Sequence, residues 1–200
     1  MVESLVKALD TAAGAPALAN LRHDPSDLDA ARLAAGKIER AAKTINGATG
    51  AAAGFGGAIS ATLDLPASIG IALRSIRDIG RAYGFDGTGE AEKLFRLQVL
   101  ELAALDDPEL RADRIAAIER TIADDGSLRI VSGDASTPMV DAAIERISRA
   151  MAFVTFRRRL GMVVPIAGSA VGLIVNRSFQ EDVAKAAWFA FQERWLKTRP

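Results

Sequence analysis

The chain has 200 residues, with 25 basic and 25 acidic side chains, and it carries no net charge at pH 7. This length suits one domain with a sizeable core, and the charge balance argues against nucleic-acid binding, which needs a basic surface. The sequence lacks cysteine, which excludes disulfides, thiolate zinc sites and cysteine nucleophiles. The only histidine, His23, lies in a turn and is a poor basis for a Ser–His pair. We therefore predict no catalytic, cofactor-binding or metal-binding residue.

Charge is distributed unevenly along the chain. Residues 86–135 hold twelve acidic and six basic side chains, whereas residues 136–200 hold ten basic and five acidic ones. Two interpretations stay open: the two regions face each other in the fold, or a basic surface meets anionic lipid. The basic run Arg157, Arg158 and Arg159 is a candidate for the lipid contact.

Helix signals are frequent along the first half of the chain, and half of the residues are hydrophobic while few are aromatic. We predict helices over residues 2–19, from a cap at Ser26 or Asp27 to about residue 46, from Asp64 to Tyr83, and over 89–105. In this scheme Asp64 is an N-cap, Pro66 stands in the first turn, Gly84 ends the helix and Thr88 caps the next one.

The second half continues this pattern. Asp107 and Pro108 start a helix that runs to about residue 124, and residues 128–132 are the only place for a short strand. Further helices are predicted from Thr137 to the basic run and from Ser178 to about Lys197, where Ser178 and Glu181 form a capping box. The sequence thus predicts one all-α domain over residues 1–200 with eight or nine helices. The N-terminal segment does not resemble a signal peptide, so we expect a cytoplasmic protein.

Two uncharged segments are rich in glycine, residues 44–63 and 160–176. Each could be a phosphate-binding loop, a membrane span or a helix that packs closely against another. Neither contains a phosphate-loop motif after a strand, which excludes the first explanation. The first is too polar for a membrane span, and the second is short and divided by Pro165. Glycines at steps of three and four residues share one helix face, which lets two backbones approach closely. We therefore predict that the two segments are helices in contact through these glycines: Gly50, Gly54, Gly57, Gly168 and Gly172.

Two blocks of the sequence resemble the EcsC family. They are "ATGAAAGFGGAISATLDLPASIGIALRSIRDIGRAYGFD" at 48–86 and "PIAGSAVGLIVNRSFQEDVAKAAWFAF" at 165–191, which together cover about a third of the chain. The family is named after a bacterial operon that also encodes an ABC transporter. The resemblance implies a helical, membrane-associated protein without an assigned reaction. Its motif residues Asp64, Tyr83, Asn176 and Asp182 have no role that the sequence defines.

In the helix predicted to end at Tyr83, apolar residues at helical spacing share one face: Ile69, Ala72, Leu73, Ile76, Ile79 and Tyr83. Basic residues follow the other face. Arg74, Arg77 and Arg81 are candidate contacts for lipid headgroups or other anions. The alternative is a solvated face on which Arg74 pairs with Asp78. An aromatic stripe on the last helix, formed by Trp188, Phe191 and Trp195, is either core or an interfacial membrane helix.

The leading hypothesis is a non-enzymatic helical protein that associates peripherally with membrane or lipid at the cytoplasmic face, beside a membrane-protein partner such as a transporter. One alternative is an enzyme for a lipid or small hydrophobic substrate, with Asp64, Asp78 or Asp182 in a pocket. The other is a protein-binding scaffold that exposes an apolar patch without a basic rim.

Overall fold

The protein is all-helical throughout the part that the computed structural model describes, which comprises residues 11–129 without 13 and 55–59, residues 142, 145 and 146, and residues 168–199. The helices there are α2 (Leu28–Gly54), α3 (Ser60–Ala82), α4 (Glu90–Ala104), α5 (Pro108–Thr121) and α7 (Gly168–Lys197). The predicted all-α class is confirmed. The predicted number of eight or nine helices is not confirmed by these five.

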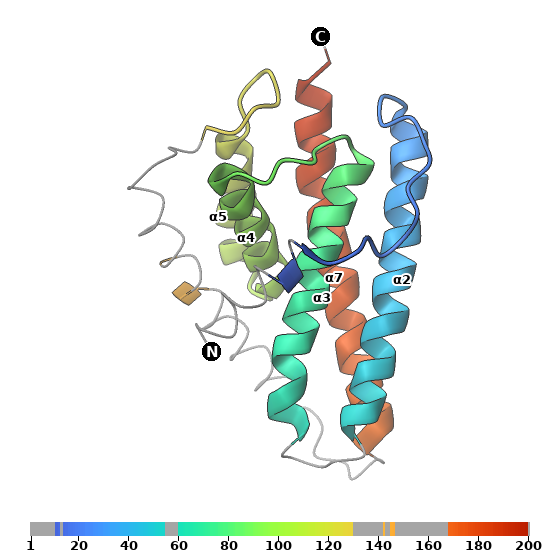
Figure 1. The fold of residues 1–200 in the computed structure, drawn as a ribbon. Helices are drawn as coiled ribbons and strands as arrows, with labels where there is room; N and C mark the ends of the chain where they lie inside the picture. The colour runs from blue at the N-terminus through green and yellow to red at the C-terminus, as the bar shows by residue number, and fades with distance from the viewer. Residues whose placement is uncertain are drawn as a thin grey trace.

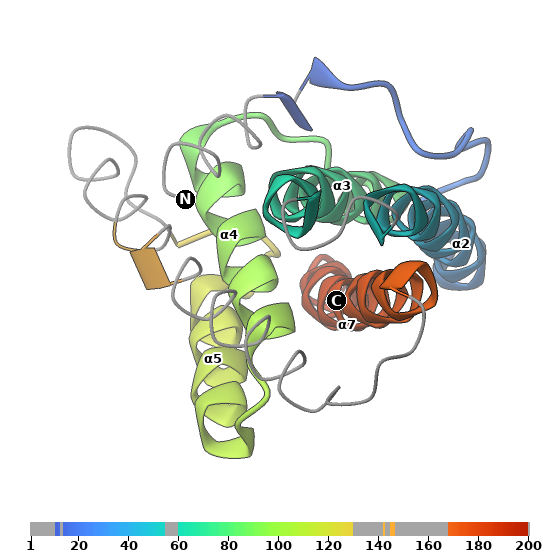
Figure 2. The same cartoon turned by 90° about the horizontal axis from the view of Figure 1, so that it is seen from below.

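The three longest helices form a bundle. α2 runs antiparallel to α3 and α7, and all three lie side by side (Figure 1). Seen along the bundle, α4 and α5 lie across it, with α4 against α3 and α7 and α5 on the outer side of α4 (Figure 2). Residues 11–27, which we call the N-terminal strap, cross the outer face of α3 before α2 begins.

Several predicted helix ends are confirmed. Asp27 caps α2, because its Oδ1 accepts hydrogen bonds from the backbone N–H groups of Asp29 (2.9 Å) and Ala30 (3.2 Å). Asp107 caps α5 in the same way, and Pro108 stands at the first helical position. Gly84 follows α3 with a φ of 88°, a left-handed conformation that glycine adopts without strain.

Other predicted boundaries are wrong. α3 begins at Ser60, so Asp64 is not its N-cap and Pro66 lies inside the helix. α7 runs without a break through Asn176 and Ser178, because no glycine or proline interrupts it after residue 172 and the local capping signal is overridden. In the strap the chain leaves the helical conformation before Pro16, which disfavours helix in the residue that precedes it.

Smaller differences concern the loops. The N-cap of α4 is Gly89 rather than Thr88. The expected short strand is reduced to a single antiparallel bridge between Ile122 and Leu128, while residues 130–132 lie outside the described residues. The predicted helix from Thr137 to the basic run also lies outside them, apart from residues 142, 145 and 146, which are helical.

The glycine segments belong to helices that lie together. The C-terminal end of α2, which contains Gly50 and Gly54, and the N-terminal end of α7, which contains Gly168 and Gly172, are at the same end of the bundle (Figures 1 and 2). Gly57 is outside the described residues. Contact between the glycine faces stays a prediction. No helix in the described ranges is long and apolar enough to cross a membrane.

The core forms where α2, α3, α4 and α7 meet. The predicted apolar face of α3 is buried in full: Ile69, Ala72, Leu73, Ile76, Ile79 and Tyr83. Phe191 of α7 lies at the centre, 5.4 Å from the Phe95 ring of α4, with the two rings edge to face. Gly80 of α3 faces the Phe191 ring so closely that an added Cβ would lie 2.7 Å from its Cζ.

This contact makes Gly80 a sensitive position. We expect Gly80→Ala to lower the free energy of unfolding by about 1–3 kcal/mol, because the fully buried Phe191 ring has no room to move. The matched control is Gly70→Ala on the same helix, where an added Cβ meets no atom within 4 Å. That variant should be as stable as the native protein or up to about 1 kcal/mol more stable. Urea unfolding of both variants tests the prediction, and equal effects would contradict it.

Candidate anion-binding site

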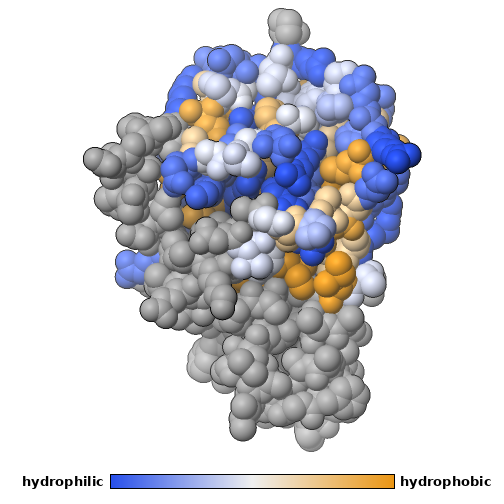
Figure 3. Space-filling view, viewed as in Figure 1, coloured by the Kyte–Doolittle hydropathy of each residue, from blue (hydrophilic) through white to orange (hydrophobic). Residues whose placement is uncertain are grey.

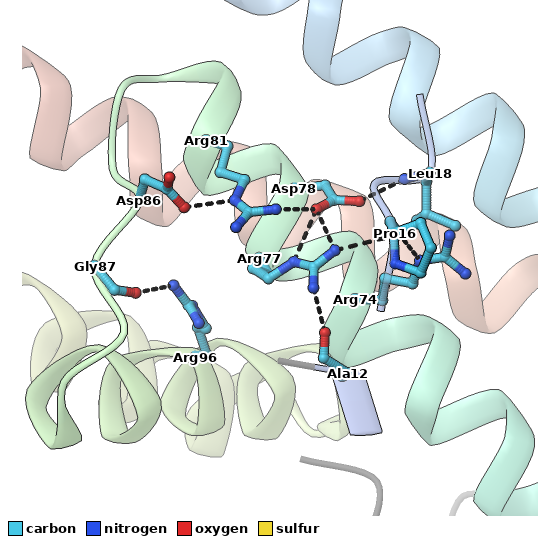
Figure 4. A network of polar contacts seen from close by, with 10 residues as sticks. All are labelled: Ala12, Pro16, Leu18, Arg74, Arg77, Asp78, Arg81, Asp86, Gly87 and Arg96. Atoms are coloured by element: carbon cyan, nitrogen blue, oxygen red, sulfur yellow. Dashed lines mark hydrogen bonds and ion pairs between the residues drawn. The ribbon is translucent and has the colours of Figure 1, made fainter. Parts of the chain in front are cut away.

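A buried ion pair joins α3 to the N-terminal strap. The side chains of Arg77 and Asp78 are 3% and 0% exposed, and Arg77 Nη2 lies 2.8 Å from Asp78 Oδ1. Asp78 Oδ2 also accepts a hydrogen bond of 2.7 Å from the backbone N–H of Leu18. Arg77 in turn donates to the carbonyl groups of Ala12 and Pro16 (Figure 4). The strap thereby finds partners for backbone groups that no regular secondary structure satisfies.

These contacts correct the sequence interpretation of this helix face. Arg77 and Asp78 are not solvated, since the strap covers them. Arg74 does not form the expected pair with Asp78; its Nε donates to the carbonyl of Pro16 at 2.6 Å. Asp78 is approached instead by Arg81, whose Nη1 lies 3.6 Å from Oδ1.

Beside this pair, a recess opens between α3 and the start of α4. The recess and the open solvent at its mouth together take up about 500 Å³. Its lining contains four cations (Arg77, Arg81, Lys93 and Arg96), one carboxylate (Asp86) and the uncharged residues Ala12, Leu73 and Thr88. Hydrophilic side chains gather over the middle of the face on which α3 and the strap lie (Figure 3). We call this pocket the cationic recess.

Two of the cations in the cationic recess have a carboxylate partner close to the surface. Arg81 Nε lies 2.5 Å from Asp86 Oδ1, and Lys93 Nζ lies 3.0 Å from Glu90 Oε1. Glu90 and Asp86 are 47% and 69% exposed, so water weakens both pairs. An incoming anion could therefore compete for these two cations at low cost.

Arg96 differs from the other three cations because it has no carboxylate within ion-pair distance among the described residues. The side chain is buried, with 7% of the residue exposed. One guanidinium nitrogen donates to the carbonyl of Gly87, while the buried Nε–H has no hydrogen-bond partner (Figure 4). Burial lowers the pKa of Arg96 below its ordinary value, and Glu92 opposes this shift. An anion in the recess would supply the negative charge that pairs with Arg96.

The wall formed by α4 is fixed by Arg194 of α7. Its guanidinium lies 4.1 Å from the centre of the Phe85 ring, and its Nη1 lies 2.7 Å from Glu92 Oε1. Its Nε also donates to the carbonyl of Gly126 at 2.7 Å. These contacts hold the linker between α3 and α4 and the first turn of α4, so the recess is built on fixed elements.

Of the residues predicted to contact anions, the structure brings Arg77 and Arg81 into the recess. Arg74 lies against the strap, and Arg157, Arg158 and Arg159 are outside the described residues. Asp182 is half-buried on α7 and does not line the recess, and Asp64 and Asn176 lie within α3 and α7. The aromatic stripe packs against the core: Phe191 is fully buried, whereas Trp188 and Trp195 are partly buried, and Trp195 Nε1 donates to the carbonyl of Pro25 at 2.8 Å.

Sequence reasoning missed Lys93, Arg96 and Thr88. The two cations stand three residues apart, which places them on one face of α4, and this spacing was the available signal. The surrounding residues are predominantly acidic, so the local charge count concealed them.

Tyr83, a motif residue without an assigned role, is the only tyrosine of the chain and is 2% exposed. Its hydroxyl group is buried without a hydrogen-bond partner. Burial raises the pKa of Tyr83 above its ordinary value, and the positive charge of Arg32 opposes this shift only in part. The structure thus gives Tyr83 a place in the core at the end of α3.

The raised pKa of Tyr83 predicts a loss of stability in alkali. The unfolded state ionises at about pH 10 and the native state only above that, so stability from neutral Tyr83 is complete below pH 10 and falls above it. Tyrosinate absorbance should titrate at higher pH in the native protein than in urea. Tyr83→Phe should reduce the alkaline fall in the free energy of unfolding. A native titration midpoint at or below that in urea would contradict the prediction.

The pair Arg77–Asp78 predicts a large effect of removing one charge. Asp78→Asn should lower the free energy of unfolding by about 3–5 kcal/mol, because it removes the buried negative charge that lies 2.8 Å from the Arg77 guanidinium. The same substitution at Asp29, whose pair with Arg32 is largely exposed, should have little effect. Urea unfolding measures both changes, and limited proteolysis should show faster cleavage in the strap of Asp78→Asn. A small effect at Asp78 would show that the pair does not hold the strap.

Comparison with known proteins places the chain in a family. The family model described as the EcsC protein family matches residues 8–196. The chain is similar to the uncharacterized protein YdbA of Bacillus subtilis (strain 168), with 28% identity over 167 residues, which are 82% of this chain and 56% of the relative. The chain thus spans little more than half of that relative's length. No solved structure matches the chain. Because the family model covers nearly the whole sequence, this protein belongs to the EcsC protein family.

Proposed function

We propose that the protein is a non-enzymatic helical protein that associates peripherally with membranes by binding anionic lipid at the cationic recess. The observation that carries the proposal is the recess itself, where four cations and one carboxylate line a pocket that opens on the surface. Anionic headgroups are attracted to such a site by charge and held by arginine hydrogen bonds. The proposed location is the cytoplasmic face of a membrane, beside a membrane-protein partner such as a transporter.

The proposal also includes a second lipid contact and a contact between α2 and α7. The basic run Arg157, Arg158 and Arg159 is proposed as a second contact with anionic lipid. Close packing of Gly50, Gly54 and Gly57 against Gly168 and Gly172 is proposed to hold α2 and α7 together at the end of the bundle away from the strap.

An enzyme acting on a lipid or small hydrophobic substrate is the second candidate, and the recess favours it less than binding. The buried carboxylate beside the recess, Asp78, does not line it and accepts hydrogen bonds from Leu18 and Arg77 on its two oxygens. A general base must have an oxygen within reach of the proton that it abstracts. Asp86, the carboxylate that lines the recess, is exposed and paired with Arg81, so it lacks the burial that adjusts a carboxylate for proton transfer at neutral pH.

Vesicle flotation tests the proposed function. The native protein should float with phosphatidylglycerol vesicles at low salt, less so at high salt, and not with phosphatidylcholine alone, because salt screens exposed charges. The double variant Lys93→Gln, Arg96→Gln should float severalfold less. The control variant Lys37→Gln, Arg120→Gln loses the same charge at exposed positions outside the recess and should float like the native protein. Native protein that stays in the soluble fraction with anionic vesicles at low salt would refute the proposal.

A further inference from the structure

The chemical class of the anion follows from how the donors of the recess are arranged. Arg77 and Arg81 approach from α3, Thr88 from the linker, and Lys93 and Arg96 from α4. A planar carboxylate offers two oxygens in one plane, whereas a phosphate group offers three outer oxygens in different directions. Donors that line one recess from three elements suit the phosphate better than the carboxylate.

The charges of the recess favour an anionic ligand. Arg77 shares Asp78 with Arg81, which also uses Asp86, and Lys93 uses Glu90. Among the described residues, three carboxylates thus pair with three of the four lining cations, and Arg96 is the cation without one. Its Nε–H is buried without a partner, and the residue is 7% exposed. A buried guanidinium with a free donor is stabilised by an anion that accepts two parallel hydrogen bonds, which phosphate and carboxylate both do, so the choice of phosphate rests on the spread of the donors over three elements.

From this arrangement we infer that the cationic recess is a phosphate site, in which Arg96 is the principal contact and Thr88 and Lys93 complete the set of donors. The inference rests on the proposed function for the location of the ligand, and it adds the chemical group that is recognised. That group is a phosphate monoester or inorganic phosphate. It comes either from a lipid such as phosphatidic acid or from a small soluble metabolite.

Inorganic phosphate and glycerol 3-phosphate are the probes for this site. Titration calorimetry of the full chain should show saturable binding of one equivalent of each, and succinate should not compete. Arg96→Gln should weaken binding at least about tenfold, because it removes charged hydrogen bonds from a buried site. Arg96→Lys, which keeps the charge but not the planar fork, should restore part of the affinity. The control Arg120→Gln, at an exposed position of α5, should bind like the native protein.

A second variant keeps the test valid if Arg96→Gln fails to fold. Thr88→Val keeps the shape of an exposed loop residue and removes its hydroxyl, so it should fold and bind phosphate severalfold more weakly. Absence of saturable phosphate binding, equal binding by Arg96→Gln and Arg120→Gln, or competition by succinate as strong as by phosphate would each overturn the inference.

Vesicles distinguish the two sources of phosphate. If phosphatidic acid vesicles bind more protein than phosphatidylglycerol vesicles of equal charge, and Arg96→Gln removes the difference, the site reads a lipid headgroup. Phosphate binding without this preference assigns the site to a soluble phosphate compound. Flotation by native protein and Arg96→Gln alike, without phosphate binding, would overturn the phosphate site and leave peripheral lipid association standing. Phosphate binding without any flotation would overturn peripheral lipid association and leave the phosphate site standing.

Discussion

The buried pair Arg77–Asp78 is the interaction on which the strap, the outer face of α3 and the recess all depend. Removing two charges from water is costly, and their mutual attraction offsets that cost only when further hydrogen bonds complete their shells. Here the strap supplies those bonds through the Leu18 N–H and the carbonyls of Ala12 and Pro16. The strap and the pair therefore require each other, and the strap sets one edge of the recess through Ala12.

The opposite wall depends on close packing around Phe191. Gly80 allows α3 to approach the Phe191 ring, which also meets the rings of Phe85 and Phe95. Arg194, one turn further along α7, covers the Phe85 ring and pairs with Glu92. α7 thereby fixes the linker and the first turn of α4 relative to α3. The cations of the recess come from different helices, but a common core sets their spacing.

Much of the fold was predictable because it rests on local signals. The buried face of α3 followed from apolar residues at helical spacing, and the caps Asp27 and Asp107 from side chains that accept backbone hydrogen bonds. The predicted caps at Asp64 and Ser178 were wrong because a cap signal also occurs inside a helix when the apolar pattern continues on both sides.

The recess was only half predictable. Arg77 and Arg81 stand out on one helix, but the burial of Arg77 depends on a strap about sixty residues earlier in the chain. The packing of α3 against α4 across the intervening loop also produces no periodic pattern in the sequence.

A structural role alone does not account for Arg96. Elsewhere in the described chain, buried charges are matched: Glu101 holds Arg114 and Arg146 at 2.7 and 3.1 Å, and Arg194 holds Glu92. Arg96 is the buried cation in these ranges that has no carboxylate within ion-pair distance, and it lines a recess whose walls hold more cations than acids. A long apolar side chain would fill the same space without the cost of a buried charge. The positive charge of Arg96, which has no carboxylate partner in these ranges, is therefore the feature on which the proposed phosphate site rests.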